Sequence, residues 1–224
     1  MPETAARNEG ELTLIDYGAG NLGSVGNALA SLNVPFRVIN EPSGLPQSAG
    51  IILPGVGAFA AAMERLNAMK MVEPLTEMVV RQKTPFLGIC LGMQLLADDS
   101  TEQGLHQGLG WIRGHIREIP PAPGVRIPHV GWNTTRIAQP DMFTNIDDGA
   151  HFYYDHSFAM ECAPDLVAAD CSYGRPVTAA VQAGHIWGTQ FHPEKSQRNG
   201  LVLLRNFSNF VRNRARMMKS AQHA

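Results

Sequence analysis

The chain contains one stretch, PFLGICLGMQLL at Pro85–Leu96, in which an apolar run turns directly into a helical pattern. The run passes through Gly88 and ends at Cys90, and residues with good helix propensity follow at once. The segment GICLG has the layout of a nucleophile elbow, with cysteine where a hydrolase would have serine. Gly88 and Gly92 let strand and helix approach without side-chain clash, so the turn lifts the sulfur clear of the sheet. The stretch therefore predicts a strand-to-helix corner with a thiol at its tip.

A thiol at this place has two interpretations. At a helix N-terminus the unpaired N–H groups and the helix dipole favour thiolate over thiol. The same N–H groups, that of Leu91 among them, can hold a developing oxyanion. The alternative is a buried, inert cysteine, which is what most cysteines are. The motif alone leaves both interpretations open, and a partner for the thiol is needed to choose between them.

Strand and helix patterns alternate before this stretch, and strand patterns dominate after it. Alternating strands and helices are predicted at residues 12–17, 21–32, 36–39, 50–54 and 59–82, the last with a break near Pro74. Such alternation is typical of parallel βαβ units with helices on both faces of a sheet. A helix is expected at residues 91–98, strands follow at 110–119, 152–158, 166–173, 177–182 and 185–191, and a final helix is expected at 197–217.

These patterns predict an α/β fold with a mixed, largely parallel central sheet, helices on both faces and an antiparallel-leaning second half. We expect a single domain at residues 11–217, a flexible N-terminal tail at 1–10 and a C-terminal tail at 218–224. The chain has 224 residues, of which 44% are hydrophobic, and this suits one globular domain with a proper core.

Charge and cysteine content argue against several classes of function. The formal net charge of −2 gives no reason to expect a nucleic acid as the main partner. No apolar run approaches the roughly 18 residues of a membrane span, and the N-terminus lacks the pattern of a signal peptide. Three cysteines without metal-like spacing suit a reduced cytoplasm, and Cys162 and Cys171 are expected to be structural. We predict neither a metal nor a cofactor.

A dinucleotide site is the alternative from a different class. The stretch GAGNLG at Gly18–Gly23 is a literal G-x-G-x-x-G between a predicted strand and a predicted helix, and Glu41 follows at the spacing of a ribose-binding acid. The same glycines also suit a tight turn with positive φ and close packing. Because the motif matches easily by chance, we favour the turn.

A histidine and a carboxylate supply the partner that the thiol needs. In WGTQFHPEKS, His192 and Glu194 stand two residues apart at the end of a predicted strand, and Pro193 disfavours helix there. In an extended segment residues i and i+2 face the same way, so an imidazole and a carboxylate are presented side by side. This is the arrangement of a general base and the group that orients it.

The thiol corner and the His-Pro-Glu segment resemble the class I (triad) glutamine amidotransferases. In that family Gly-x-Cys-x-Gly-x-Gln supplies the nucleophile and His-Pro-Glu completes the triad. The resemblance implies that Cys90 is the nucleophile, His192 the general base and acid, and Glu194 its orienting group. The stretch LPGVGAF falls where the family has its oxyanion strand, which makes Val56 an oxyanion donor beside Leu91. The glutamine-binding candidates are Gly55, Gly57, Gln94, Ser157 and Phe158.

Within this class the sequence is most similar to the glutaminase subunits of imidazole glycerol phosphate synthase, from LIDYGAGNLGSV to GLVLLRNF. The resemblance implies that glutamine is hydrolysed to glutamate and ammonia. The ammonia would pass to a cyclase subunit, built as a (β/α)₈ barrel, that makes imidazole glycerol phosphate and an aminoimidazole carboxamide ribonucleotide in histidine biosynthesis. A cytoplasmic heterodimer without nucleic acid or membrane contacts is implied. A glutaminase of the same fold that feeds another synthase is the alternative within the class.

The resemblance also indicates where the partner binds. Four interface candidates come from the stretch IPHVGWN: Pro128, Val130, Trp132 and Asn133. The fifth is Lys195, which follows Glu194 of the triad. Apolar and aromatic side chains are typical of the centre of such an interface. The sequence departs from the family pattern at Val130, where methionine is common, and at Asp155, which replaces an apolar residue. Neither position belongs to the triad.

Overall fold

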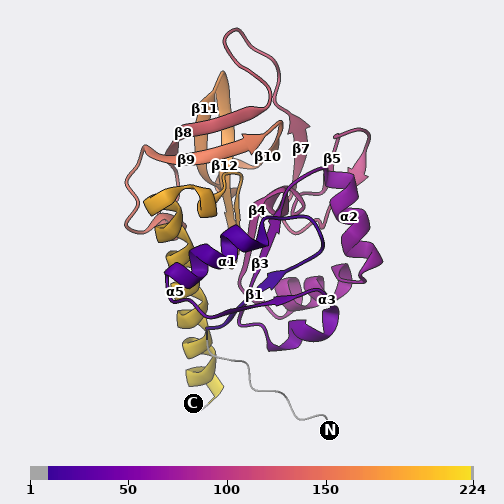
Figure 1. Ribbon diagram of the computed structural model, residues 1–224, viewed down its shortest axis with the longest axis vertical. Helices are drawn as coiled ribbons and strands as arrows, with labels where there is room; N and C mark the ends of the chain where they lie inside the picture. Colours follow the sequence, from indigo (N-terminus) through magenta and orange to yellow (C-terminus); the bar gives the residue numbers. More distant parts are fainter. Residues whose placement is uncertain (1–9, 223–224) are drawn as a thin grey trace.

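The computed structural model describes residues 10–222, and the predicted N-terminal tail lies outside them except for Gly10. Within this part of the chain a nine-stranded sheet has the order β2-β1-β3-β4-β13-β12-β11-β8-β9 (Figure 1). Its strands are β1 (Leu12–Ile15), β2 (Phe36–Ile39), β3 (Gly50–Gly55), β4 (Phe86–Cys90), β8 (His129–Ile137), β9 (Ala150–His156), β11 (Val167–Tyr173), β12 (Arg175–Ala183) and β13 (Ile186–Thr189).

The strands from β2 to β13 in this order are parallel to one another, and those from β12 to β9 alternate in direction. This confirms the prediction of a mixed α/β sheet with an antiparallel second half. The sequence pattern does not predict strand β8, because Pro128 and Gly131 interrupt the apolar alternation at its start. It also does not predict a separate sheet of order β10-β7-β5-β6. Its strands are β5 (Asp99–Ser100), β6 (His106–Gln107), β7 (Gly114–Glu118) and β10 (Phe158–Cys162).

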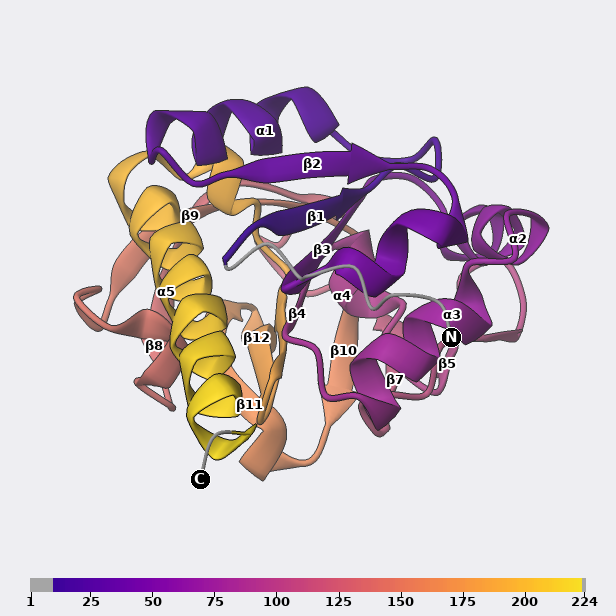
Figure 2. The ribbon, with the colours of Figure 1, turned by 90° about the horizontal axis from the view of Figure 1, so that it is seen from below.

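Helices cover both faces of the main sheet, as Figure 2 shows. They are α1 (Leu22–Ser31), α2 (Phe59–Ala68), α3 (Val72–Thr76), α4 (Leu91–Gln94) and α5 (Gln197–Gln222). On one face α1 and α5 bury Leu29 and Phe207 in a core cluster with Leu12. On the other face α2 and α3 bury Leu66 and Leu75 in a second cluster. Burying these apolar faces on the two sides of one sheet is the main source of stability in such a fold.

Helices α2 and α4 end earlier than predicted, and helix α5 ends later. Helix α2 ends at Ala68, and the positive φ of 55° at Lys70 keeps the helix from continuing, so that Pro74 sits in the first turn of α3, where no N–H is needed. Helix α4 ends at Gln94 instead of continuing to residue 98. The carbonyls of Leu95 and Leu96 accept N–H groups of Leu109 and Trp111, so they are used by a crossing loop rather than by a longer helix. At the other end of the chain α5 continues past residue 217, the predicted limit of the domain.

Candidate active site

The corner between β4 and α4 holds Cys90 in a conformation that is uncommon for a residue with a side chain. Its φ is 53° and its ψ is −108°, and only 5% of the residue is exposed. A Cβ atom on Gly92 would lie 1.9 Å from the carbonyl oxygen of Leu53, and one on Gly88 would lie 2.4 Å from that of Gly92. The glycines are therefore required by the close approach of helix and strands. The predicted strand-to-helix corner is confirmed.

The residues after β13 carry the imidazole and the carboxylate. His192 Nδ1 lies 2.8 Å from Glu194 Oε1, and each side chain is 2% exposed. His192 is extended, but Pro193–Lys195 form a short 3-10 turn, so the turn rather than a continuous strand brings the two side chains together. The backbone is held at this place by two hydrogen bonds: His192 N donates to the Tyr153 carbonyl, and the Ser196 hydroxyl donates to the His192 carbonyl.

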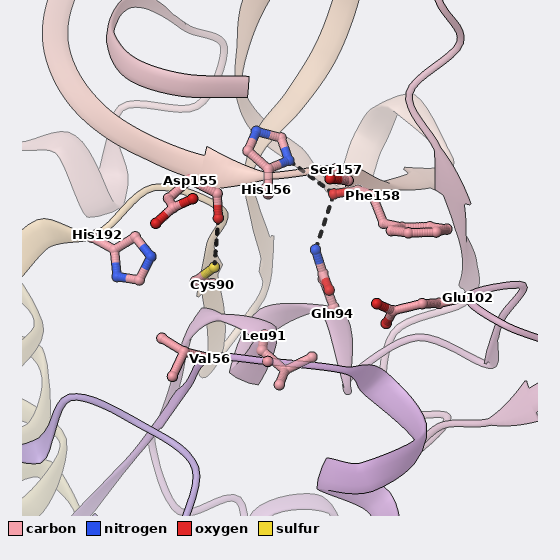
Figure 3. A pocket seen from close by; sticks show the side chains of 11 residues that line it. Val56, Cys90, Leu91, Gln94, Glu102, Asp155, His156, Ser157, Phe158 and His192 are labelled. Carbon is pink, nitrogen blue, oxygen red and sulfur yellow. Dashed lines mark hydrogen bonds between the residues drawn. The ribbon is translucent and has the colours of Figure 1, made fainter. Parts of the chain in front are cut away.

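Two opposing effects act on the His192 imidazole. Burial lowers its pKa, whereas hydrogen bonding and charge interactions with Cys90 and Glu194 raise it, and the net result is a pKa of about 10. Among the described residues Nε2 of His192 has no hydrogen-bond partner of ordinary geometry, and Figure 3 shows the ring beside the Cys90 sulfur. The carboxylate thus orients the ring through Nδ1 and leaves Nε2 for proton transfer at the thiol.

The Cys90 sulfur opens into a cavity of about 260 Å³ (Figure 3). The residues lining it are Val56, Gly57, Cys90, Leu91, Gln94, Glu102, Asp155, His156, Ser157, Phe158 and His192. The structure therefore brings eight of the predicted site residues to one cavity. These residues come from distant parts of the sequence, from Val56 to His192. Gly55 is not among the lining residues. It pairs with Cys90 across β3 and β4, and a Cβ on it would lie 2.4 Å from the Tyr17 hydroxyl.

Four polar residues at or beside the cavity were not among the predicted site residues: Glu102, Asp155, His156 and Gln190. The Glu102 carboxylate lines the wall opposite His192 and accepts a hydrogen bond of 2.7 Å from the Phe59 N–H. Gln190 donates to the Cys90 sulfur at 3.7 Å and accepts from Gln94 Nε2 at 3.1 Å. His156 lines the cavity, and its Nδ1 lies 2.8 Å from the Phe158 carbonyl oxygen. No local motif marks these four residues as site residues, although Gln190 lies two residues before His192 in WGTQFHPEKS.

Three of the predicted interface residues, Val130, Trp132 and Asn133, lie on β8, which pairs with β9 at the edge of this cavity. Val130 and Trp132 are 54% and 47% exposed, and Val130 pairs in register with Asp155, which lines the cavity. The Asp155 carbonyl accepts a weak hydrogen bond from the Cys90 thiol at 3.8 Å. Lys195 Nζ lies 5.5 Å from the centre of the Tyr153 ring on β9. Pro128 precedes β8 after a cis peptide bond.

The GAGNLG stretch, which suggested a dinucleotide site, lies outside the cavity at Cys90. The GAGNLG turn caps α1 through the Asn21 side chain and is held by Arg65, which donates to the Gly18 carbonyl. None of its residues lines the cavity at Cys90.

Across residues 10–222, no three His, Cys, Asp or Glu side chains gather in the manner of a metal site. Within the same range, no helix has the length and apolar character needed to cross a bilayer.

The fold and the Cys–His–Glu site define a class of protein, and comparison with known families agrees. The model of the family "Glutamine amidotransferase class-I" matches residues 13–209. The chain belongs to the class-I glutamine amidotransferases. Within that class it belongs to the family of the imidazole glycerol phosphate synthase subunits HisH, as its curated relatives establish.

Two of these relatives illustrate the similarity. HisH 1 of Campylobacter jejuni strain RM1221 is 43% identical over 197 residues, which cover 88% of this chain and 98% of the relative. HisH of Desulfitobacterium hafniense strain DSM 10664 / DCB-2 is 46% identical over 200 residues, covering 88% and 93%. The crystal structure of a putative GMP synthase protein from Thermoplasma acidophilum has a TM-score of 0.70 at 18% identity and covers 93% of this chain and 97% of that one. At that identity the likeness concerns the fold alone.

Proposed function

We propose that this chain hydrolyses glutamine to glutamate and ammonia through Cys90, His192 and Glu194, and that it delivers the ammonia to a cyclase subunit. The observation that carries the proposal is the placement of a thiol on a strained corner with a buried, carboxylate-bound imidazole beside it at one cavity. Membership in the HisH family supports the choice of glutamine as substrate and of histidine biosynthesis as the pathway.

The chemistry follows from the positions of the three side chains. The Cys90 thiolate attacks the side-chain amide carbon of glutamine, and the oxyanion that forms accepts hydrogen bonds from the backbone N–H groups of Leu91 and Val56. His192 Nε2 gives its proton to the departing nitrogen, so ammonia leaves and a γ-glutamyl thioester remains. The same nitrogen then takes a proton from water, whose oxygen attacks the thioester and releases glutamate. Glu194 holds the ring in the tautomer that both steps require.

The opposite wall of the cavity supplies the contacts for the amino-acid end of the substrate. The carboxylate of Glu102 and the side-chain oxygen of Gln94 face the cavity (Figure 3). Both are acceptors, and an α-ammonium group is a donor that matches them. Glutamine would lie with its ammonium toward this wall and its amide at the Cys90 sulfur. Ser157, which precedes β10, and Phe158, its first residue, border the same space.

Ammonia in water at neutral pH soon becomes ammonium and loses its nucleophilic lone pair. It must therefore reach its acceptor without entering bulk water, which calls for an acceptor site docked over the cavity. The exposed side chains of Val130 and Trp132 stand beside the cavity and provide an apolar surface for this purpose. We propose a heterodimer in which the (β/α)₈ cyclase subunit covers this surface. Lys195 and Asn133 belong to the same contact, with Pro128 at its border. The free thiols of this chain suit the cytoplasm as the place of assembly.

The decisive experiment separates the two half-reactions in the reconstituted complex. We expect Cys90→Ala to abolish synthesis from glutamine and to leave synthesis from added ammonium unchanged, because the acceptor site lies on the other chain. Cys162→Ala is the matched control, since Cys162 lies outside the cavity and should keep both activities. Loss of the ammonium-dependent reaction in Cys90→Ala would contradict this division of labour. Activity with a different synthase, and none with the cyclase, would favour the alternative acceptor.

A further inference from the structure

A pair of buried histidines lies between the cavity and the exposed side of β8 and has no part in the chemistry described above. His129 on β8 and His156 on β9 face each other in register and are 2% and 6% exposed. His129 Nδ1 lies 2.9 Å from His156 Nε2. Two imidazoles in direct hydrogen-bond contact, both out of water, need a definite arrangement of protons.

The contacts at either end of the pair determine that arrangement. The Phe158 carbonyl can only accept a hydrogen bond, so His156 Nδ1, at 2.8 Å from it, must carry the proton. His156 Nε2 then accepts from His129 Nδ1, which leaves His129 Nε2 as an acceptor for Asn133 Nδ2 at 3.2 Å. The amide of Asn133 is itself oriented, because Nδ2 also donates to the Ser172 carbonyl at 3.0 Å. Both histidines are therefore neutral and carry their proton on Nδ1.

The surroundings of the pair hold this state in place. The His129 ring stacks between the rings of Tyr154 and Tyr173, with centroids 4.7 Å and 3.8 Å away, so it has little room to rotate. Burial lowers the pKa of His129 to about 4. Burial does the same to the pKa of His156, where the neighbouring His129 and His192 add to the effect and the Phe158 carbonyl opposes it. The rings consequently stay neutral through the physiological range.

The inner end of this chain of hydrogen bonds reaches the residue that binds the substrate. Gln94 Nε2 donates to the same Phe158 carbonyl at 3.0 Å and to Gln190 Oε1 at 3.1 Å. With both of its protons used inside the protein, Gln94 turns its side-chain oxygen to the cavity, as Figure 3 shows. If the Phe158 carbonyl moved, Gln94 would lose one of the two bonds that hold this oxygen in place.

We propose that His156 and His129 are positioning residues for glutamine, which hold the Phe158 carbonyl and through it the acceptor oxygen of Gln94, and that Asn133 sets their tautomer from the outer side. The inference rests on the proposed function, since it assigns Gln94 to the substrate. It adds a physical path of three hydrogen bonds between β8, where the cyclase is proposed to dock, and the glutamine wall. A shift of the Asn133 amide on docking would reach the substrate along this path.

The first test is spectroscopic and needs no activity. The chain is labelled with ¹⁵N-histidine, and the ring nitrogens of His129 and His156 are assigned with the single variants His129→Asn and His156→Asn. We expect both native rings to be neutral with the proton on Nδ1 at pH 7, and Asn133→Asp, which has no N–H to donate, to change the His129 signals. A native ring protonated on Nε2, or charged at pH 7, would overturn the proposal.

The second test uses the glutaminase rate of the ligand-loaded complex. His129→Leu and Asn133→Asp each break the path, and we expect the KM for glutamine to rise about fivefold to tenfold, the effect of losing one hydrogen bond, with kcat within about twofold. His129→Asn places a donor where Nδ1 stood and should restore the native KM. Tyr173→Phe is the matched control, because it keeps the stacked ring and removes only the hydroxyl bond to the Arg126 carbonyl.

The outcomes are distinguishable from a failure of the proposed function. An unchanged KM in both path-breaking variants, or a loss of kcat alone, would overturn the positioning role. If His129→Leu fails to fold, the comparison of Asn133→Asp with Tyr173→Phe decides the same question. A native complex that does not hydrolyse glutamine would contradict the proposed function, while the ring tautomers would still be read from the spectrum.

Discussion

The hydrogen bond between His192 and Glu194 allows a quantitative prediction. Its length is 2.8 Å, and both side chains are 2% exposed, so the carboxylate acts on the imidazole with little screening by water. Hydrogen bonds to charged groups contribute about 1.5–3 kcal/mol. If that energy is used to stabilise the imidazolium in the transition state, its loss slows kcat about tenfold to hundredfold.

Two substitutions divide this effect into orientation and charge. Glu194→Gln keeps an oxygen that accepts from Nδ1 but loses the charge, whereas Glu194→Ala loses both. We expect the alanine variant to show the full reduction and the glutamine variant a smaller one, with His192→Ala slower than either, because removal of the base costs more than removal of the group that orients it. The assay is glutamate release by the ligand-loaded complex at saturating glutamine. Native rates in both Glu194 variants would refute the triad assignment.

The same substitution has a consequence for stability that can be measured without a partner. Because the folded-state pKa of His192 is raised to about 10 from 6.5, its protonation stabilises the fold fully below pH 6.5. This stabilisation is lost as the pH rises through about 10. Glu194 is one cause of the raised pKa, so Glu194→Gln should lose less stability between pH 6.5 and 10 than the native chain. Urea unfolding at several pH values measures the difference, and parallel curves for the two proteins would contradict the reasoning.

Further predictions concern the other thiols and the control of activity. Burial raises the pKa of Cys162 to about 11 and that of Cys171 to about 12, so both stay protonated, and serine at either position should leave turnover within a few-fold. Val56 lies between Gly55 and Gly57, and the peptide unit that carries its N–H begins at Gly55, whose lack of a Cβ atom leaves this unit free to rotate. In the isolated chain we expect a backbone carbonyl, instead of an N–H, to point at the oxyanion site. The glutaminase rate should then be about 10²–10³-fold lower than in the ligand-loaded complex. Steady-state rates of the chain alone, with cyclase, and with cyclase plus ligand test this, and full activity of the free chain would refute it.

The sequence alone was sufficient for the parts of the molecule that depend on local geometry. The corner at Cys90 could be predicted from Gly88 and Gly92. The close approach of a helix to a strand excludes a Cβ atom at these two positions. The His192–Glu194 pair follows from a spacing of two residues, which brings the side chains together in more than one local conformation. The parallel sheet of the first half follows from alternating strand and helix patterns.

Tertiary structure alone determined which distant segments meet at the cavity. Gln94 and Gln190 are separated by 96 positions and touch only because β4 and β13 lie side by side in the sheet. Glu102 reaches the cavity because the small second sheet returns the chain across α4. His129 meets His156 only in one register of β8 on β9, and a shift of one residue would turn each side chain to the other face. Such contacts arise from strand order and register, which are settled by burial of the whole core and carry no local signal in the chain.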